Sequence, residues 1–327
     1  MRIKEVNFQD IFKKYEDELI EVEKELRNIF NSDAALIPTI GAYIINSGGK
    51  RIRPLFLLVS SDLAGYKGYK RVIMAAVIEA LHTASLLHDD VVDEAEIRRG
   101  KASANKIWGN QIAVLLGDYL YARALHISVA QESLPIMEAL SWATSQMAEG
   151  EILQLMKAGD PSITFDEYIK IITGKTAGLI RASCRIAGIL GELPEEKIQA
   201  LTDFGHNIGV AFQMKDDILD YVADQNELGK KLGKDLMEGK ITLPLIELIK
   251  KAKEKEEIIK IIKSDNLSEE SLDKILQHLK KYNCIESSMK IVKQYVDRAK
   301  KALEIFPDSD AKQNLFRIAD YILFRSK

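Results

Sequence analysis

Apolar residues recur at helical spacing along almost the whole of this 327-residue chain, and strand-like alternation is hard to find. No Pro-, Gly- or Ser-rich tract interrupts the pattern, because the 7 prolines and 19 glycines are scattered. A chain of this length often divides into two domains, but no linker marks a boundary here. The sequence therefore predicts a single all-α domain over residues 1–327.

Composition narrows the classes of function. A net charge of −3 does not suit a protein that binds nucleic acid. The first ten residues are polar and have no signal-peptide core, and we expect no apolar run that reaches the length of a membrane span. The two cysteines, Cys184 and Cys284, form no motif and agree with a reducing compartment. These observations predict a soluble, cytoplasmic protein.

Two aspartate-rich clusters share the pattern DDxxD and lie 127 residues apart, at 89–93 and 216–220. One such cluster is often an ordinary solvated helix face, whereas two identical ones suggest a shared role. On a helix, positions i and i+4 share a face, which aligns Asp89 with Asp93 and Asp216 with Asp220. Facing carboxylates repel unless they protonate or bind cations, and Mg²⁺ combines one or two of them with water and substrate phosphate. The clusters therefore predict a Mg²⁺–diphosphate site between two helices.

Basic residues gather at three places along the chain. The first is GGKRIRP at 48–54, at the start of a predicted helix, where free N–H groups favour an anion and arginine can grip phosphate oxygens. The second is Arg98-Arg99, and the third is Lys175-Thr176 together with Lys230, Lys234 and Lys240. Each group alone is typical of a solvated surface. Combined with the acidic clusters, they predict two phosphate sites, one bridged by metal and one held by Lys and Arg alone.

His82 lies seven residues, or two helical turns, before Asp89 and so shares the face of the first acidic cluster. A lone histidine is more often a satisfied core residue, and both interpretations stay open from spacing alone. Residues 94–109 and 224–242 are predicted to be loops, the second lying over the site. From residue 243 onward, four or so Lys/Glu-rich helices carry no recognisable chemistry and are predicted to form an outer layer.

Seven segments appear together in this chain: GGKRIRP (48–54), ALHTASLLHDDVVDEAEIRRG (80–100), LLGDYLYARA (115–124), MAEGEILQL (147–155), GKTAGLI (174–180), FQMKDDILD (212–220) and LGKKLGKDLMEGKITLPL (228–245). With them the sequence resembles the all-trans isoprenyl diphosphate synthases, or polyprenyl synthetases, in that family's order and spacing. The resemblance implies the isoprenoid synthase fold, a bundle of about ten or more mostly antiparallel helices around a central cavity. The catalytic motifs would lie within 48–245 and a helical layer within 246–327.

The resemblance also implies a role for each matching position. The direct ligands of about three Mg²⁺ ions, bridged by substrate diphosphate, would be Asp89, Asp93 and Asp216, supported by Asp90, Asp217 and Asp220. The allylic diphosphate would be bound by Arg98, Lys175 and Lys230. Isopentenyl diphosphate would be bound by Lys50, Arg53, His82 and Arg99. Lys240 would close over the loaded site, and Thr176 and Gln213 would face the developing cation.

The implied reaction is the sequential head-to-tail condensation of isopentenyl diphosphate onto an allylic primer, either farnesyl or geranylgeranyl diphosphate. No obvious general base lies in the matched segments, which fits loss of the proton to the released diphosphate. By family analogy we expect a homodimer and a product used for quinone side chains. Membrane contact is expected to be transient at most, during product release, because no basic amphipathic helix is present.

Product length is predicted from a stripe of small and apolar residues. Ala84 and Ser85, about one turn before Asp89, are small where early-stopping family members tend to carry a bulky aromatic residue. On the facing helix the stripe consists of Leu140, Ala143, Thr144, Met147 and Gln154, with Leu140 about 21 Å from Gln154 along the axis. Such a depth holds roughly four isoprene units in a straight line and more if the chain bends. We predict a product of roughly C30–C50, near octaprenyl, with Leu140 at the floor, although plain core packing also explains the stripe.

Three alternatives remain open. A shorter-chain geranylgeranyl or farnesyl diphosphate synthase shares the chemistry. A terpene cyclase shares the helical fold and one DDxxD, but needs neither a second DDxxD nor a metal-free diphosphate site. A non-catalytic partner subunit of a heteromeric synthase would be expected to have lost acidic positions, whereas all six aspartates are present.

Overall fold

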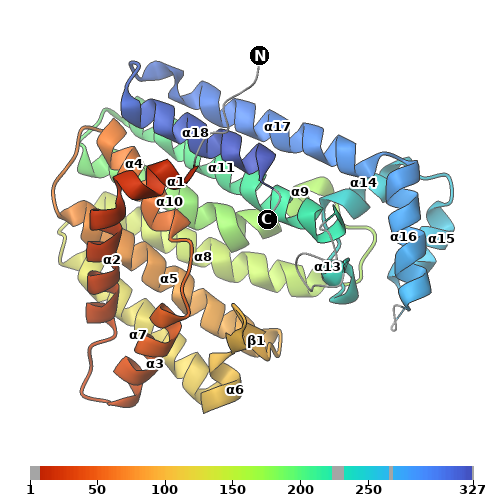
Figure 1. Ribbon diagram of the computed structural model, residues 1–327, viewed down its shortest axis with the longest axis horizontal. Helices are drawn as coiled ribbons and strands as arrows, with labels where there is room; N and C mark the ends of the chain where they lie inside the picture. The colour runs from red at the N-terminus through yellow and green to blue at the C-terminus, as the bar shows by residue number, and fades with distance from the viewer. Residues whose placement is uncertain (1–7, 223–231, 265–267, 326–327) are drawn as a thin grey trace. The chain divides into compact units, whose positions relative to one another are not determined.

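The computed structural model describes residues 8–222, 232–264 and 268–325, and these are almost entirely helical (Figure 1). The prediction of an all-α chain is confirmed, with one two-stranded hairpin as the exception in the described residues. The chain forms two compact units, each built from several segments. Unit 1 comprises Met1–Thr144, Leu179–Thr202 and Ile305–Leu315, and unit 2 comprises Ser145–Gly178, Asp203–Glu304 and Phe316–Lys327. The boundaries fall inside helices rather than in linkers, and the single domain stays a prediction.

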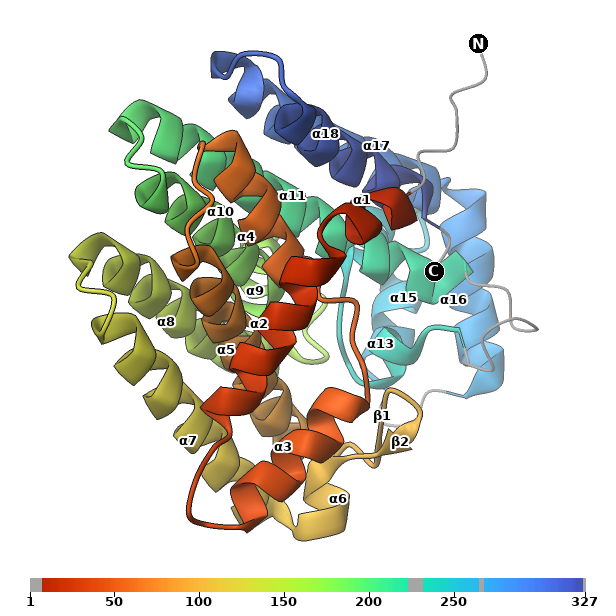
Figure 2. The same cartoon turned by 60° about the vertical axis from the view of Figure 1, so that its left-hand side comes forward.

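Unit 1 is built around α5 (Lys70–Val92), a long apolar helix buried on most sides. It packs against α2 (Glu16–Ile29), α4 (Ile52–Leu63) and α7 (Asn110–Val129) (Figure 2). The same unit contains α1 (Phe8–Lys14), α3 (Leu36–Asn46), β1 (Ile97–Arg98), β2 (Lys101–Ala102) and α6 (Ala104–Trp108), with parts of α8 (Leu134–Lys157), α10 (Gly178–Leu190), α11 (Glu195–Val222), η2 (Leu303–Ile305) and α18 (Asp310–Phe324). The first acidic cluster, residues 89–93, therefore lies at the C-terminal end of the central helix of unit 1.

Residues 94–109 are not the plain loop that the sequence predicts. They contain the antiparallel pair β1–β2 and the short helix α6. The two residues between the strands, Arg99 and Gly100, both have positive φ, at 51° and 75°. Positive φ at both central positions is the geometry of the tightest hairpin turns. Strands of two residues are too short to produce an apolar alternation, which is why the sequence pattern missed them.

Unit 2 contains the rest of α8, α10, α11, η2 and α18, with α9 (Phe165–Ile172), α13 (Lys234–Met237), α14 (Leu243–Lys251), α15 (Lys255–Ile262), α16 (Glu269–Lys281) and α17 (Cys284–Ala302). A π-helix, η1 (Thr173–Ala177), joins α9 to α10. Its Gly174 fits closely against α8, because a Cβ there would lie 2.8 Å from Gly150 Cα. Of the loop predicted at 224–242, residues 223–231 lie outside the described residues, and 234–237 form α13.

Two described helices, α5 and α7, are long and apolar enough to cross a membrane by length and composition alone. The expectation of no such run was therefore wrong by that measure. For α5 the apolar stretch is 67% buried, as in the core helix of a soluble protein, whereas for α7 it is only 33% buried. The exposed apolar side of α7 therefore needs its own explanation.

Candidate functional site

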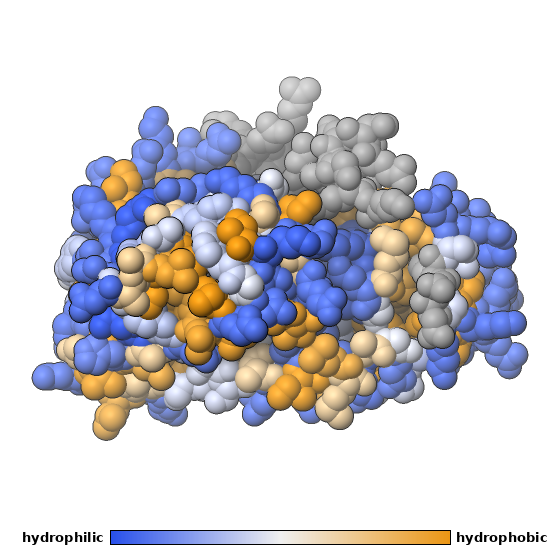
Figure 3. Space-filling view, turned by 90° about the horizontal axis from the view of Figure 1, so that it is seen from below, coloured by the Kyte–Doolittle hydropathy of each residue, from blue (hydrophilic) through white to orange (hydrophobic). Residues whose placement is uncertain are grey.

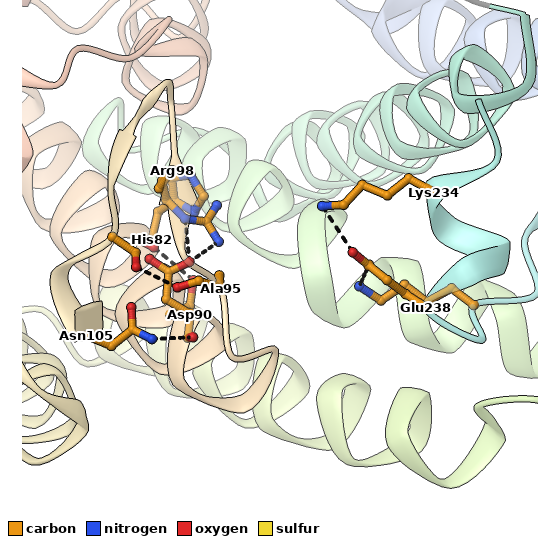
Figure 4. A network of polar contacts seen from close by, with 10 residues as sticks. His82, Asp90, Ala95, Arg98, Asn105, Lys234 and Glu238 are labelled. Carbon is orange, nitrogen blue, oxygen red and sulfur yellow. Dashed lines mark hydrogen bonds and ion pairs between the residues drawn. The ribbon is translucent and has the colours of Figure 1, made fainter. Parts of the chain in front are cut away.

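The first acidic cluster lies at the end of α5, and its three aspartates differ in exposure. Asp90 is buried, Asp89 is partly exposed and Asp93 is exposed. The carboxylate of Asp90 accepts hydrogen bonds from Arg98 Nε at 2.6 Å and Nη2 at 2.5 Å (Figure 4). Its backbone carbonyl accepts from the side-chain amide of Asn105 at 3.0 Å. Asp90 thus ties the hairpin to α5, while Asp89 and Asp93, one turn apart, offer the accessible carboxylates.

A cavity of about 480 Å³ in unit 1 brings together the four residues assigned by resemblance to isopentenyl diphosphate: Lys50, Arg53, His82 and Arg99. We call it the basic pocket; its lining is completed by Ser47, Gly49, Arg51, Ile52 and Glu79. Burial lowers the pKa of His82 well below its ordinary value, and the surrounding arginines lower this pKa further. His82 is therefore neutral near pH 7. Arginines close enough to disfavour a positive imidazole also provide the positive potential that a diphosphate needs.

Arg51, in the GGKRIRP segment, uses its positive charge in ion pairs within the protein rather than for an anion in the basic pocket. Arg51 is buried, and its guanidinium pairs with Glu79 at 2.9 Å and with Glu23 at 3.0 Å. Glu79 is itself buried on α5. The pair joins the start of α4 to α5 and α2, so Arg51 stabilises the wall of the pocket, and Lys50 and Arg53 remain the residues of this segment suited to an anion.

The second group of predicted residues gathers in unit 2. A cavity of about 120 Å³ is lined by Lys175 of the π-helix, Gln213 and Asp217 of α11, and Lys240 after α13. Thr176 Oγ1 donates to Gln213 Oε1 at 2.5 Å, and Lys175 Nζ donates to Gln154 Oε1 at 3.3 Å. Lys175, Thr176, Gln213, Asp217 and Lys240 therefore lie close together in unit 2. Lys230 lies outside the described residues.

Buried carboxylates crowd this second cavity. Burial raises the pKa of Asp217 to about 7, and Asp235 raises it further. Burial likewise raises the pKa of Asp235 to about 6, with a contribution from Asp220. The backbone N–H of Asp235 donates to Asp220 Oδ2 at 3.0 Å, which holds the α13 segment against the end of α11. Sequence reasoning did not single out Asp235, although it lies within a matched segment.

Asp216, the third predicted metal ligand, has an arginine partner that the sequence did not indicate. Arg325, which follows α18, donates from Nη2 to Asp216 Oδ1 at 2.5 Å and to the Phe212 carbonyl at 2.9 Å. Its guanidinium also lies 4.0 Å from the centre of the Phe212 ring. The side chain of Arg325 is 3% exposed and that of Asp216 is 40% exposed. Arg325 therefore holds one carboxylate oxygen of Asp216, while the Asp216 side chain still reaches solvent.

Among the described residues, no group of three or more His, Cys, Asp or Glu side chains is arranged to hold a metal ion by itself. Mg²⁺ does not require such a group, because it keeps several waters and binds through one or two carboxylates plus substrate phosphate. Asp89, Asp93 and Asp216 fit that use, since each is a carboxylate that is at least partly exposed.

The residues predicted to set product length are mostly interior. Ala84 on α5 and Leu140, Ala143 and Met147 on α8 are buried, and Ser85 and Thr144 are partly buried. Burial agrees both with a tunnel lining and with core packing, so their role stays a prediction.

Comparison with known proteins identifies the family. The polyprenyl synthetase family model matches residues 34–279. Octaprenyl diphosphate synthase of Escherichia coli is 38% identical over 323 residues, which covers 98% of this chain and 100% of that protein. A decaprenyl diphosphate synthase structure from Rhodobacter capsulatus has a TM-score of 0.93 at 37% identity, covering 98% of this chain and 99% of its own.

A second solved structure adds bound groups. A polyprenyl synthase from Caulobacter crescentus, complexed with calcium and isoprenyl diphosphate, has a TM-score of 0.91 at 35% identity, covering 99% of each chain. Relatives at this identity and coverage confirm the resemblance that the seven segments indicated. The chain is a prenyltransferase and belongs to the polyprenyl synthetase family.

Proposed function

We propose that this protein is an all-trans polyprenyl diphosphate synthase that adds isopentenyl diphosphate, head to tail and with Mg²⁺, to an allylic diphosphate primer. The observation that carries the proposal is the basic pocket, where several arginines surround a neutral His82. An enzyme that joins two diphosphate esters needs one site that holds a diphosphate without metal, and this pocket has the charge for it. A long product would suit quinone side chains.

In this mechanism, Arg98, Lys175 and Lys230 stabilise charge on the departing diphosphate while the allylic C–O bond breaks, and Lys240 closes over the loaded site. Thr176 and Gln213 face the allylic cation with their oxygen atoms. The double bond of isopentenyl diphosphate, held by the basic pocket, attacks the cation, and the released diphosphate takes the proton that is lost. When bound by Asp89, Asp93 and Asp216, Mg²⁺ would supply Lewis-acid stabilisation of the leaving oxygens.

The direct test is to incubate the purified protein with isopentenyl diphosphate, farnesyl diphosphate and Mg²⁺ and to analyse the products by mass. A ladder that ends at one long product supports the proposal. A product that stops at C20 or shorter would keep the chemistry and exclude the long-chain assignment. Diphosphate binding without any product would favour a partner subunit instead.

Product length should respond to two substitutions. Ala84→Phe is expected to shorten the product, because the ring would occupy the space about one turn below Asp89. Leu140→Ala is expected to lengthen it by about one or two units, because the floor would be removed. Mass analysis of products from each variant measures both. An unchanged length for Ala84→Phe contradicts the tunnel path, and an unchanged length for Leu140→Ala contradicts only the floor.

Arg325→Gln should raise the Mg²⁺ concentration needed for half-maximal activity. Residues that orient a metal ligand typically change metal affinity by about 10–100-fold when removed, and Arg325 holds one oxygen of Asp216. We expect an increase of about tenfold with little change in maximal rate. Arg317→Gln, an exposed arginine on the same α18, is the control. Equal Mg²⁺ requirements in both variants would show that Arg325 does not act on Asp216.

We further propose that a second copy of this chain covers α7. One side of this helix exposes Val114, Leu115, Leu125 and Val129, of which Leu115 is 62% and Val129 60% exposed. Apolar residues also reach the surface among hydrophilic ones in Figure 3. An exposed apolar helix face is suited to a two-fold dimer. Sedimentation should therefore give a dimer for the wild type, a monomer for Leu115→Glu and a dimer for the control Ile20→Glu on α2. A monomeric wild type contradicts the proposal.

A further inference from the structure

A chain of three hydrogen bonds connects a buried tyrosine to the residues proposed to face the cation. Tyr168 donates to Asp217 Oδ2 at 2.6 Å, Gln213 Nε2 donates to Asp217 Oδ1 at 2.8 Å, and Thr176 donates to Gln213 Oε1 at 2.5 Å. The relative exposures of Tyr168, Asp217 and Thr176 are 2%, 4% and 5%. All four residues lie within unit 2, on α9, the π-helix and α11.

The chemistry of the four groups fixes the direction of every bond. A side-chain amide has one donor end and one acceptor end, whereas an ionised carboxylate, which is the form of Asp217 above its pKa of about 7, accepts only. Because the Nε2 end of Gln213 is turned to Asp217, the Oε1 end must face Thr176. A threonine hydroxyl has a single hydrogen, which goes to Gln213 Oε1, so the hydroxyl presents only lone pairs elsewhere. Oxygen lone pairs directed at a developing carbocation stabilise its positive charge.

Tyr168 is the buried donor at the start of this series of hydrogen bonds. Burial raises the pKa of its hydroxyl well above the ordinary value, and the charge of Asp217 raises it further, so the hydroxyl remains a donor. Without this hydroxyl, Asp217 would keep one of its two bonds, and its carboxylate could rotate and no longer select the Nε2 end of Gln213. Tyr168 also lies on α9, the helix that runs directly into the π-helix that carries Thr176. Such single turns of π-helix are often found at functional sites.

We infer that Tyr168 is a positioning residue for prenyl transfer, which acts through Asp217 to turn the oxygen atoms of Gln213 and Thr176 toward the allylic cation. The inference rests on the proposed function, in which these two oxygens face the reacting carbon. It assigns Asp217 a different role from Asp216, although both belong to the same DDxxD cluster. Asp216 would bind Mg²⁺, and Asp217 would orient the side-chain amide of Gln213 from inside the protein.

The test compares Tyr168→Phe with Tyr221→Phe. Tyr221 is also a buried tyrosine, on α11, and it does not belong to the three hydrogen bonds. Small misplacements of a catalytic group can cost about 100-fold in rate, and we expect Tyr168→Phe to lower kcat by about 10–100-fold. The KM values for both diphosphates should stay within about twofold, because ground-state binding is unaffected. A loss of the same size in Tyr221→Phe would mean that any buried hydroxyl matters, and would overturn the inference.

Two further measurements separate positioning from plain stabilisation. Residues that act as one unit are non-additive, so Tyr168→Phe should cause no further loss of kcat in a Gln213→Leu background. An equal loss in both backgrounds would overturn the inference. If Tyr168→Phe does not fold, Asp217→Asn replaces it: kcat should fall while the Mg²⁺ requirement stays unchanged. A raised Mg²⁺ requirement would make Asp217 a metal ligand and overturn the assignment.

A crystal structure of Tyr168→Phe makes the result independent of the reaction. Gln213 is expected to leave Thr176 in that variant and to keep it in Tyr221→Phe. An unchanged Gln213 in Tyr168→Phe would contradict the inference even if the rate falls. If the wild-type protein forms no prenyl product, the proposed function fails, and the position of Gln213 in this crystal structure still decides whether Tyr168 orients it.

Discussion

Asp89→Asn should lower kcat for prenyl transfer by about a thousandfold. The substitution keeps the size of the side chain and removes the negative charge proposed to hold Mg²⁺ at the leaving diphosphate. Metal stabilisation of transition-state charge is worth several kcal/mol, and about 1.4 kcal/mol corresponds to a factor of ten in rate. Asp89 is partly exposed at the end of α5, so the change should hardly alter stability. Steady-state rates at saturating substrates and several Mg²⁺ concentrations provide the measurement.

The matched control for this prediction is Glu94→Gln. Glu94 is an exposed acid just beyond the same cluster, and its substitution removes the same charge. We expect its kcat to stay within about twofold of the wild type, since exposed changes away from special features have small effects. Comparable losses in both variants would show that the local negative potential matters rather than a ligand at Asp89. Full activity of Asp89→Asn would remove the first DDxxD cluster from the mechanism.

Arg51→Ala should lower the free energy of unfolding by about 3–5 kcal/mol. Removing one partner of a buried ion pair leaves the other charge buried without compensation, which costs about this much. Here the stranded group is Glu79, whose side chain is 4% exposed. Because the sequence places Arg51 inside GGKRIRP, the motif alone would suggest a loss of substrate binding instead. Urea unfolding of the substrate-free protein measures the predicted effect.

Lys50→Ala provides the comparison for Arg51→Ala. Lys50 is the preceding residue, is exposed and lines the same basic pocket. Its loss should change the unfolding free energy by less than about 0.5 kcal/mol and should raise KM for isopentenyl diphosphate. Equal destabilisation by the two substitutions would mean that Arg51 and Glu79 contribute no more than a surface charge. Arg51→Lys should lower the free energy of unfolding by less than Arg51→Ala does, because lysine keeps the charge but cannot reach both carboxylates in the same way.

The repeated DDxxD pattern predicted where the acidic residues lie, and the family resemblance gave their middle members, Asp90 and Asp217, supporting roles, but neither showed that these two are buried. Asp90 and Asp217 are both buried and both paired inside the protein, with Arg98 and with Tyr168 and Gln213 respectively. Helix geometry explains the difference, because successive residues are about 100° apart and the middle aspartate points away from the face shared by i and i+4. What the sequence could not show was the partner that each buried carboxylate would find.

The fold was predictable where the apolar pattern is long. Residues 69–92 carry an uninterrupted apolar pattern with a clear helical period, and α5 is found at Lys70–Val92. The hairpin and the π-helix were not predictable in the same way. A two-residue strand has no period, and one extra residue in a helical turn leaves composition unchanged. Arg325 was missed for another reason, since it lies 109 positions from its partner Asp216 and belongs to none of the matched segments.

Two arginines in the described part of the chain have the left-handed backbone conformation, and both line the basic pocket: Arg51 at φ 46° and Arg99 at φ 51°. A non-glycine residue in this conformation costs of order 1 kcal/mol or more, and glycine or asparagine would adopt it more easily. Neither replacement could supply a guanidinium. The chain therefore gives up conformational free energy at two positions to keep arginine there. At Arg51 the buried ion pair with Glu79 offsets this cost. At Arg99 no such buried pair is described, so selection for thermal stability alone would act against Arg99, and heat-adapted variants obtained without an activity screen would tend to lose that arginine from the pocket.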